Sequence, residues 1–410
     1  SETPYFFSRT ALMYVYMGHM KFEHTQPYEN WFWDKNRIDL KQALVEKVDT
    51  SSKTLFLDSG EKVNYSKLIL ATGSKPNKFG WPGQDLKGVQ GLYSKQDLDN
   101  LEETTKNGIT RGVIIGGGLI GIEMAEMLLS RKYPVTFLVR ENTFWGNVLP
   151  VEESEMIKRH MAEHHIDLRL NTQLKEVLSD DLGNARAILT DKGEEIPCQV
   201  VGLTAGVSPN IDFVKSSDIE TNRGILVNEY LETNIKGVYA IGDCAEFRKH
   251  PSGDRRPIEQ VWYTGKIMGK TLATSICKSP LIYNPGHWFN SAKFMDIEYQ
   301  TYGWVFPKPK EGEKHFYWEH EGGKKSVRLC YNSETRQFVG LNTFGIRMRH
   351  QAFDKWLTEE RSVEFVLEHL ADANFDPEFF KLHEKEIVSK FNKENNTTIQ
   401  LKKKSWKRIF

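Results

Sequence analysis

The stretch VIIGGGLIGIEMAEML, residues 113–128, decides the fold. Residues 111–115, which end in three β-branched residues, predict a buried strand, and the apolar run at 119–129 predicts a helix. A second apolar, β-branched run at 135–139 predicts another strand after that helix. Strand, glycine turn, helix and strand in this order predict a βαβ unit and an α/β fold with a parallel sheet.

Gly116, Gly118 and Gly121 complete the pattern G-x-G-x-x-G. The first glycine permits a tight turn, the second lets a pyrophosphate approach the backbone, and the third lets the helix pack closely on the sheet. The helix N-terminus adds free N–H groups and a partial positive charge. This context favours dinucleotide binding over a glycine-rich turn in some other α/β fold.

The position that reads the ribose falls on Arg140 and Glu141, just after the second strand. An arginine there can pair with the 2′-phosphate of NADP, and an acid can bond the 2′-hydroxyl of NAD. Both residues are also compatible with solvated loop charges. The sequence therefore leaves NADH and NADPH open as ligands.

Two further stretches resemble strands that end at a ligand site. Residues 65–74 form a strand ending in Ala71, Thr72 and Gly73, and residues 237–245 form another that ends in Gly242 and Asp243. A carboxylate beyond the carboxyl end of a strand lies where α/β sheets bind ligands, and it can accept hydrogen bonds from a polyol. Each stretch alone is equally compatible with a strand followed by a turn.

Together and in this order, the stretches resemble the FAD/NAD(P)H-dependent pyridine nucleotide-disulfide oxidoreductase superfamily. The ferredoxin and rubredoxin reductases and the nitrite reductase large subunit are the most similar types. The resemblance covers roughly residues 1–300. Its matching pieces are Ala71-Thr72-Gly73, the glycine turn, residues 204–210, Gly242-Asp243 and residues 257–262. It implies two Rossmann-like domains, one for FAD and one for NAD(P)H.

The resemblance also implies which residues bind FAD. Asp243 would bond the ribitol, Glu2 would bond the adenosine ribose, and the helix beginning near Gln260 would face the flavin pyrimidine, where its N-terminus favours negative charge. The implied FAD-binding set is Glu2, Arg9, Val45, Ala71, Thr72, Gly73, Gly206, Gly242, Asp243, Gln260, Val261 and Trp262.

Two residues are implied near the reacting rings. Glu123, in the helix after the glycine turn, would lie close to the nicotinamide, although a partly exposed helix residue would also suit its position. Reductases of this kind often pair that glutamate with a lysine near the flavin, and here the lysine position falls on Tyr14. We expect a Tyr14–Glu123 hydrogen bond in place of the ion pair.

The family's FAD domain starts with a strand, glycine turn, helix and strand that this sequence does not show. Glu2 stands where the second of those strands would end. We therefore expect about 30 to 40 residues before Ser1, the length of one such unit.

Four cysteines occur, Cys198, Cys244, Cys277 and Cys330, with no C-x-x-C pair. The spacing fits neither a zinc site nor a disulfide framework, which favours a reducing, cytoplasmic setting. The disulfide reductases of the resembling family carry a reactive cysteine early in the chain, and residues 1–40 contain none. A thiol-based mechanism is therefore excluded, and zero net charge gives no argument for nucleic acid.

A length of 410 residues predicts about two to four domains. We expect an FAD-binding domain from residues 1–105 and 232–280, interrupted by an NAD(P)-binding domain at 106–231. Residues 281–410 should form a C-terminal α+β domain that covers the flavin or forms a homodimer interface. Its predicted elements are a strand at 297–305, a hairpin of 325–330 and 338–344, and helices at 352–357, 363–370 and 378–392.

Two smaller signals complete the analysis. His160 and His164 have the i, i+4 spacing that can bind a metal, but no third ligand is evident, so we interpret them as exposed helix histidines and predict no metal site. The basic, aromatic tail at 401–410 is interpreted as a solvated terminus, with contact to an anionic membrane or an acidic electron carrier as the alternative.

These observations predict an enzyme that takes hydride from NADH or NADPH onto FAD and passes electrons to a ferredoxin, a rubredoxin, a quinone or another small acceptor. Two alternatives remain open. One is a non-catalytic nucleotide-sensing or partner-binding flavoprotein of the apoptosis-inducing-factor type, and the other is a membrane-peripheral NADH:quinone reductase that uses the basic tail.

Overall fold

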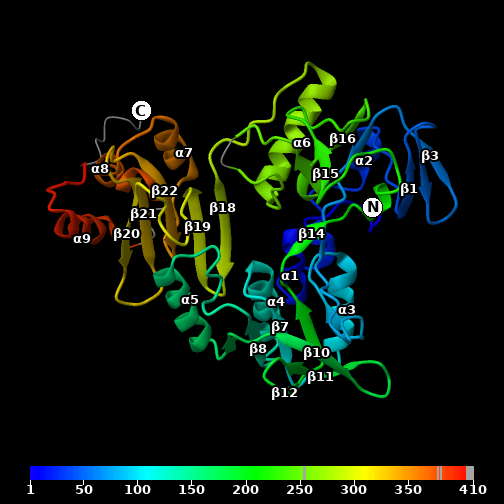
Figure 1. The fold of residues 1–410 in the computed structure, drawn as a ribbon, viewed down its shortest axis with the longest axis horizontal. Coiled ribbons are helices and arrows are strands. Elements are labelled where there is room, and N and C mark those ends of the chain that lie inside the picture. The colour runs from blue at the N-terminus through cyan, green and yellow to red at the C-terminus, as the bar shows by residue number, and fades with distance from the viewer. Residues whose placement is uncertain (253–254, 376–377, 379–380, 403–410) are drawn as a thin grey trace. The chain divides into compact units, whose positions relative to one another are not determined.

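The structure is a computed structural model that describes residues 1–252, 255–375, 378 and 381–402. The chain divides into two compact units (Figure 1). The first unit consists of Ser1–Arg140 and Asn171–Pro285. The second consists of Glu141–Leu170 and Gly286–Phe410, so a segment of 30 residues lying within the sequence of the first unit packs with the C-terminal part of the chain.

The first unit contains the predicted βαβ unit. Strand β7 (Gly112–Ile115) leads through helix α4 (Leu119–Ser130) into β8 (Val135–Val139). These strands run parallel and join β13 (Val200–Leu203) and β6 (Val89–Gln90) in the order β6-β13-β7-β8. Every residue of β7 and β8 is buried, as expected for a parallel sheet covered on both faces.

A second pair of parallel strands lies in the same unit. Strand β4 (Leu68–Leu70) pairs with β16 (Val238–Ala240), residue by residue from Leu68 opposite Val238. Helix α6 (Trp262–Cys277) packs on the turn that follows β16. Because both strands point the same way, their carboxyl ends bring Gly73 and Asp243 to one edge of the sheet.

Two short strands connect these sheets. Strand β5 (Ser74–Pro76) continues from β4, and β14 (Val207–Pro209) continues from β13. They pair antiparallel, with Ser74 opposite Pro209. The remaining elements of the unit are α1 (Leu12–Tyr16), α2 (Trp31–Lys35), α3 (Lys95–Thr105), β1 (Val45–Asp49), β2 (Thr54–Leu57), β3 (Lys62–Asn64), β10 (Leu174–Ser179), β11 (Ala185–Thr190), β12 (Glu195–Pro197), β15 (Ile225–Val227) and β17 (Ala245–Phe247).

The second unit is built on an antiparallel sheet in the order β18-β19-β22-β21-β20. Its strands are β18 (Phe289–Phe294), β19 (Ile297–Gly303), β22 (Phe338–Phe344), β21 (Ser326–Asn332) and β20 (Glu313–Glu319). Helix α7 (His350–Thr358) contacts β19 and β22, and α9 (Glu384–Asn395) contacts β20. Between them in sequence lies α8 (Val363–Glu368).

The two faces of this sheet differ in character. Val327, Leu329 and Tyr331 belong to the hydrophobic core that the C-terminal helices share. Alternate side chains point the other way, and there Arg328 bonds the glutamates of α5 (Val151–Glu163) in the inserted segment, which also contains β9 (Asp167–Leu170). One face of the sheet is therefore apolar, and the other holds buried charge.

Most predicted elements of the second unit are confirmed. The expected hairpin is β21 and β22, with Asn332 accepting the turn hydrogen bonds of Glu334 and Thr335. The predicted strand at 297–305 is β19. Strands β18 and β20 were not predicted, and α9 begins at Glu384 rather than at residue 378.

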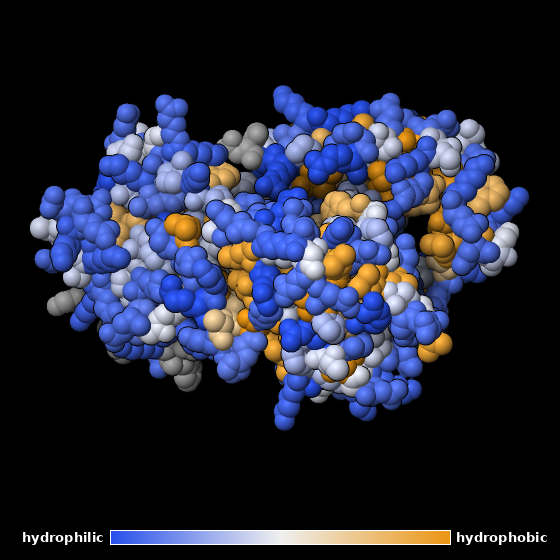
Figure 2. Space-filling view, turned by 60° about the horizontal axis from the view of Figure 1, so that its bottom comes forward, coloured by the Kyte–Doolittle hydropathy of each residue, from blue (hydrophilic) through white to orange (hydrophobic). Residues whose placement is uncertain are grey.

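On the face shown in Figure 2, hydrophilic side chains cover much of the surface and hydrophobic side chains reach it in patches. Within the described part of the chain, no helix has the length and the apolar character needed to cross a bilayer. Nearly all of the basic tail, whose membrane contact was the alternative interpretation, lies outside the described residues, since the description ends at 402.

Candidate functional site

The candidate site begins where β4 and β16 end. Gly73 has a φ of +66°, and a Cβ atom built there would lie 2.4 Å from the Tyr93 hydroxyl oxygen. Both the left-handed backbone and the close approach of the tyrosine therefore require glycine. The backbone N–H of Ser74 donates to the same hydroxyl oxygen at 2.7 Å.

Asp243 is the centre of a hydrogen-bond network at this edge. Its Oδ2 atom accepts from the Ser74 hydroxyl at 3.1 Å and from the Tyr93 hydroxyl at 3.3 Å. Gln260 donates in turn to the Ser74 oxygen at 2.7 Å. The second carboxylate oxygen, Oδ1, makes no hydrogen bond with the described residues, so it remains an acceptor for the hydroxyl of a ligand.

Burial dominates the electrostatics of this network. It raises the pKa of Asp243, against the hydrogen bonds from Ser74 and Tyr93 and the charge of Arg9, which lower it. Burial, together with the negative charge of Asp243, also raises the pKa of Tyr93 to about 12. The phenol therefore keeps its proton at neutral pH and acts as a donor to the carboxylate.

A second acid, Glu2, is linked to Tyr93 through Arg9. Arg9 Nη1 contacts Glu2 Oε1 at 2.8 Å and donates to the Tyr93 carbonyl oxygen at 2.9 Å. The Glu2 carboxylate also accepts from the Lys95 N–H, at the N-terminus of α3, at 3.4 Å. Glu2, Arg9, Tyr93 and Asp243 thus form one continuous chain of polar contacts, in which three of the predicted residues meet.

The glycine turn has the tight packing that its sequence predicts. A Cβ at Gly116, where φ is +109°, would lie 2.8 Å from the Ala205 backbone. At Gly121 it would lie 2.8 Å from the Gly116 carbonyl oxygen, because the helix packs directly on the turn. Gly118, the N-cap of α4, faces open space within 4 Å. That space, next to free helix N–H groups, suits a phosphate.

Glu123 lies one turn into α4 and is half-buried. Burial raises its pKa to about 7, and the nearby charge of Glu126 adds to the shift. Within the described residues Glu123 makes no hydrogen bond and no ion pair. A half-buried carboxyl without a cation, poised near neutral pH, is typical of a functional rather than a structural group.

The expected hydrogen bond between Tyr14 and Glu123 is absent from the described part of the chain. Tyr14 stacks on His19 instead, with ring centroids 6.0 Å apart. It is Tyr16 that is fixed in this helix, because its hydroxyl donates to Thr105 at 2.9 Å and the Arg131 guanidinium lies 3.5 Å above its ring. Helical geometry turns two residues apart to different faces, and the buried face is occupied by Tyr16.

The other predicted residues lie around these centres. Thr72 donates to the Asn210 carbonyl at 2.8 Å, and Gly206 has a φ of +89° beside Asn77. Val45 begins β1 and packs against the core beneath β4 and β16, away from the Asp243 network. Ala71 precedes Thr72 and Gly73, and Gly242 precedes Asp243. Val261 is the N-cap of α6, and Trp262 is its first residue. Arg140 is exposed just after β8, and Glu141 belongs to the second unit.

Sequence reasoning missed Ser74 and Tyr93, the two donors to Asp243. They lie 169 and 150 residues from it in the chain. Ser74 directly follows Ala71-Thr72-Gly73, so its position at the end of a ligand-binding strand was available as a signal. Nothing in the sequence around Tyr93 marks it as a partner of Asp243.

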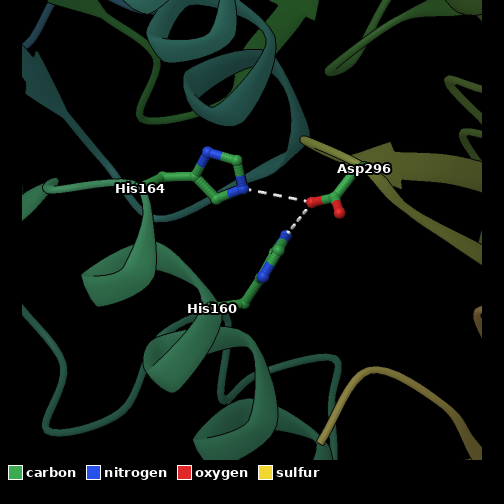
Figure 3. Close-up of side chains that lie close together, drawn as sticks. All are labelled: His160, His164 and Asp296. Carbon is green, nitrogen blue, oxygen red and sulfur yellow. Dashed lines mark hydrogen bonds and ion pairs between the residues drawn. The ribbon is translucent and has the colours of Figure 1, made fainter. Parts of the chain in front are cut away.

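The interpretation of His160 and His164 as exposed histidines is wrong for His160, whose side chain is only 1% exposed. The structure also supplies the third group that the sequence did not reveal. Asp296, from the turn between β18 and β19, lies against both imidazoles (Figure 3). Helix α5 is amphipathic, and its buried face carries His160.

The family model for pyridine nucleotide-disulphide oxidoreductases matches residues 6–266. The chain belongs to this family. The match spans both parallel-strand pairs and the glycine turn, and it ends within α6. The match includes Asp243 and its partners Ser74, Tyr93 and Gln260, whereas Glu2 and the C-terminal part of the chain lie outside it.

Relatives with assigned activities include the nitrite reductase [NAD(P)H] of Bacillus subtilis (strain 168), 31% identical over 250 residues, which cover 60% of this chain and 30% of that protein. The NADH-rubredoxin oxidoreductase of Clostridium acetobutylicum is 34% identical over 223 residues, which cover 53% of each chain. The chain thus spans about half or less of the length of these relatives.

Solved structures of this family share the fold. The ferredoxin reductase from Rhodopseudomonas palustris superposes with a TM-score of 0.75 at 19% sequence identity, covering 91% of this chain and 88% of that one. That coverage extends past the family match at residue 266 into the second unit, so the fold of the C-terminal part has a counterpart in the solved ferredoxin reductase.

Proposed function

We propose that the protein is an FAD-dependent NAD(P)H oxidoreductase that delivers electrons to a small carrier of the ferredoxin or rubredoxin type. The observation that carries the proposal is the Asp243 network, in which a carboxylate at the end of a parallel strand keeps one oxygen available for a ligand hydroxyl. The glycine turn at Gly116 and Gly118 supplies a separate phosphate-binding site.

The residues present fit FAD in their donor chemistry. Asp243 Oδ1 would accept from a ribitol hydroxyl, Glu2 would accept from the adenosine ribose, and the start of α6 would face the pyrimidine ring with its N–H groups. Gly242, with a φ of +70°, faces open space, so its backbone allows close approach of a large ligand. When bound, the flavin supplies the hydride- and electron-transfer chemistry.

Glu123 is the residue we propose to hold a proton near the nicotinamide. Its pKa of about 7, raised by burial and by Glu126, lets the carboxyl bind or release a proton within the physiological range. As a neutral acid it would donate a hydrogen bond to the carboxamide of the nucleotide. As a carboxylate it would stabilise the positive charge of the oxidised nicotinamide ring.

The cysteines argue for transfer without a protein thiol. Cys198, Cys244 and Cys330 are buried, and burial raises the pKa of the Cys244 thiol. Cys244 donates to the Leu70 carbonyl at 3.4 Å, as a packing residue does. Thiolate nucleophiles need a lowered pKa, so none of these three groups suits disulfide chemistry.

The acceptor is proposed from the family relatives. The relatives include an NADH-rubredoxin oxidoreductase, and the similar solved structures include a ferredoxin reductase. Rubredoxin and ferredoxin, which these two names contain, are iron-containing one-electron carriers. We therefore propose such a carrier as the acceptor of this chain, in preference to a quinone.

The test is a visible absorption spectrum of the purified protein with added FAD, followed by anaerobic NADH and NADPH. We expect flavin bands that bleach with at least one nucleotide, and reoxidation by ferredoxin or rubredoxin. Asp243→Asn should weaken FAD binding more than tenfold, because one of the two acceptor oxygens becomes an NH2 donor and the remaining oxygen cannot serve both the Ser74–Tyr93 pair and a ligand hydroxyl. Asp212→Asn is the matched control, since Asp212 lies among exposed lysines.

Two results would contradict the proposal. One is a protein that stays colourless with excess FAD, and the other is a bound flavin that neither nucleotide reduces. An Asp243→Asn protein with unchanged FAD affinity would remove the assigned role of Asp243 alone.

A further inference from the structure

Three potential metal ligands converge within the second unit. His160 and His164 lie one turn apart on α5, and Asp296 lies in the turn between β18 and β19. Asp296 Oδ1 is 2.5 Å from His160 Nε2 and 3.1 Å from His164 Nε2. Figure 3 shows both imidazoles directed at this one carboxylate oxygen from two sides.

His160 is oriented as metal-binding histidines usually are. Its side chain is 1% exposed, and Nε2 makes no hydrogen bond of acceptable geometry among the described residues. The other ring nitrogen, Nδ1, lies 3.4 Å from Glu163 Oε2. A carboxylate at that nitrogen fixes the tautomer that carries its proton on Nδ1, which leaves the Nε2 lone pair directed toward Asp296.

The hairpin turn holds Asp296 in place. Phe294 pairs with Ile297, so Met295 and Asp296 form a two-residue connection. Met295 has a φ of +53°, an unfavourable value for its residue type, and its side chain is buried. Lys324 Nζ lies 3.3 Å from Asp296 Oδ2, so the lysine occupies one oxygen while Oδ1 faces the histidines.

We infer that His160 Nε2, His164 Nε2 and Asp296 Oδ1 form a binding site for a divalent transition metal of the zinc type. The three ligand atoms lie within 4.8 Å of one another. Zinc bonds of about 2.0–2.2 Å place tetrahedral ligands about 3.3 Å apart, so Asp296 would move outward from its present contacts of 2.5 and 3.1 Å and the imidazoles would adjust within the span of 4.8 Å. Asp296 has room for it, because its side chain is 57% exposed.

The ligand set decides which metal is bound. Two imidazoles with one carboxylate suit Zn²⁺, Co²⁺, Ni²⁺ and Cu²⁺, whereas Ca²⁺ and Mg²⁺ require oxygen ligands. The charge of Lys324 opposes a cation nearby. Its side chain is 45% exposed and also contacts Glu163, so it can turn to that carboxylate when the metal binds.

The bound metal would join α5 to the β18–β19 hairpin within the second unit. Three protein ligands leave a fourth position for water, as in open rather than closed zinc sites. The site is separate from the Asp243 network, which belongs to the first unit. Its existence does not depend on the proposed oxidoreductase function.

The experiment uses Co²⁺ as a spectroscopic probe and Zn²⁺ in titration calorimetry on the full chain. When Co²⁺ binds at this site, its visible absorption spectrum should show the bands typical of cobalt coordinated by nitrogen and oxygen atoms. His164→Ala and Asp296→Asn should each weaken Zn²⁺ binding by more than about tenfold. His165→Asn is the matched control, because His165 is exposed, adjacent to His164 and in a left-handed conformation that asparagine tolerates.

The results separate this site from two other groups of potential ligands in the same unit, Glu313–His315–Cys330 and His320–His383–Glu386. Binding through Cys330 would give an intense sulfur-to-cobalt charge-transfer band, and binding through His383 would persist in both variants. Either result, or the absence of Zn²⁺ binding, would overturn the inference. Equal weakening in His165→Asn would also overturn it.

Discussion

Two glutamates, the half-buried Glu123 in the first unit and the fully buried Glu153 in the second, show how differently the protein treats the same chemical group. Burial raises the pKa of both Glu123 and Glu153 to about 7. Glu153 accepts from Arg328 at 3.1 Å and from Asn342 at 2.9 Å. Glu123 has neither partner among the described residues, and the nearby charge of Glu126 is repulsive. The paired carboxyl holds a helix to a sheet, whereas the unpaired one stores unfavourable energy where we propose the nucleotide binds.

The largest effect is expected at the paired residue. Glu153→Ala would leave Arg328, a nearly buried cation, without its best partner, so the free energy of unfolding of the second unit should fall by about 3–5 kcal/mol. Calorimetric unfolding of the full chain measures this. Glu152 also contacts Arg328, but its side chain is 50% exposed, and Glu152→Ala should cost about 1 kcal/mol or less. Equal losses in both variants would remove the distinction between buried and exposed partners.

At Glu123, the unpaired residue, removing the charge is expected to raise the free energy of unfolding rather than lower it. The folded pKa of Glu123, about 7, exceeds the ordinary value of 4.5, so the folded state prefers the protonated form. The contribution of protonated Glu123 to the free energy of unfolding is therefore fully present below about pH 4.5 and is lost as the pH rises through about 7. Glu123→Gln mimics the neutral acid and should make the first unit more stable than wild type at pH 8, by up to about 3 kcal/mol.

Urea unfolding at pH 5 and pH 8 checks this expectation, because the two proteins should be nearly equal at the lower pH. A Glu123→Gln protein that is less stable at pH 8 would mean that Glu123 has a stabilising partner. The comparison between the two glutamates would then fail.

Asp243 lies between these extremes, because it is buried but has two hydrogen-bond donors. Removing one of these donors is expected to give the smallest change in stability. Burial raises its pKa, but Ser74 and Tyr93 donate to it. Tyr93→Phe removes one donor and also leaves the Ser74 N–H without its acceptor, so stability should fall by about 1 kcal/mol. Thermal unfolding with and without FAD measures the change. A larger loss without FAD than with it would support a ligand that replaces the missing donor, and no change in either condition would contradict the network.

The sequence predicted the features that are local in the chain. Gly116, Gly118 and Gly121 specify a turn through their own backbone freedom, and the βαβ unit follows within about thirty residues. The β21–β22 hairpin was also predicted, since alternating strands flank a recognisable turn. The family resemblance then supplied Asp243, Glu2 and Arg9 as a set.

Features that depend on distant contacts could not be predicted. Tyr93 meets Asp243 across 150 residues, and Asp296 meets His164 across 132. Nothing in the periodicity of α5 shows which side chain will face its histidines, because that depends on how the helix packs on a sheet built from residues 286–344. Tyr14 failed as a partner for Glu123 because the resemblance fixed its position in sequence and not its direction.

The insertion of α5 within the sequence of the first unit affects the order of events during synthesis. Glu153 waits for Asn342, 189 residues further along the chain. At about 5–20 residues per second, a ribosome needs about 10–40 s to close that interval. The histidines of the nascent helix wait for Asp296, which is made before Arg328 and Asn342, the two partners of Glu153. The first unit is therefore expected to fold before residues 141–170 have all their partners, and the second unit to be completed last.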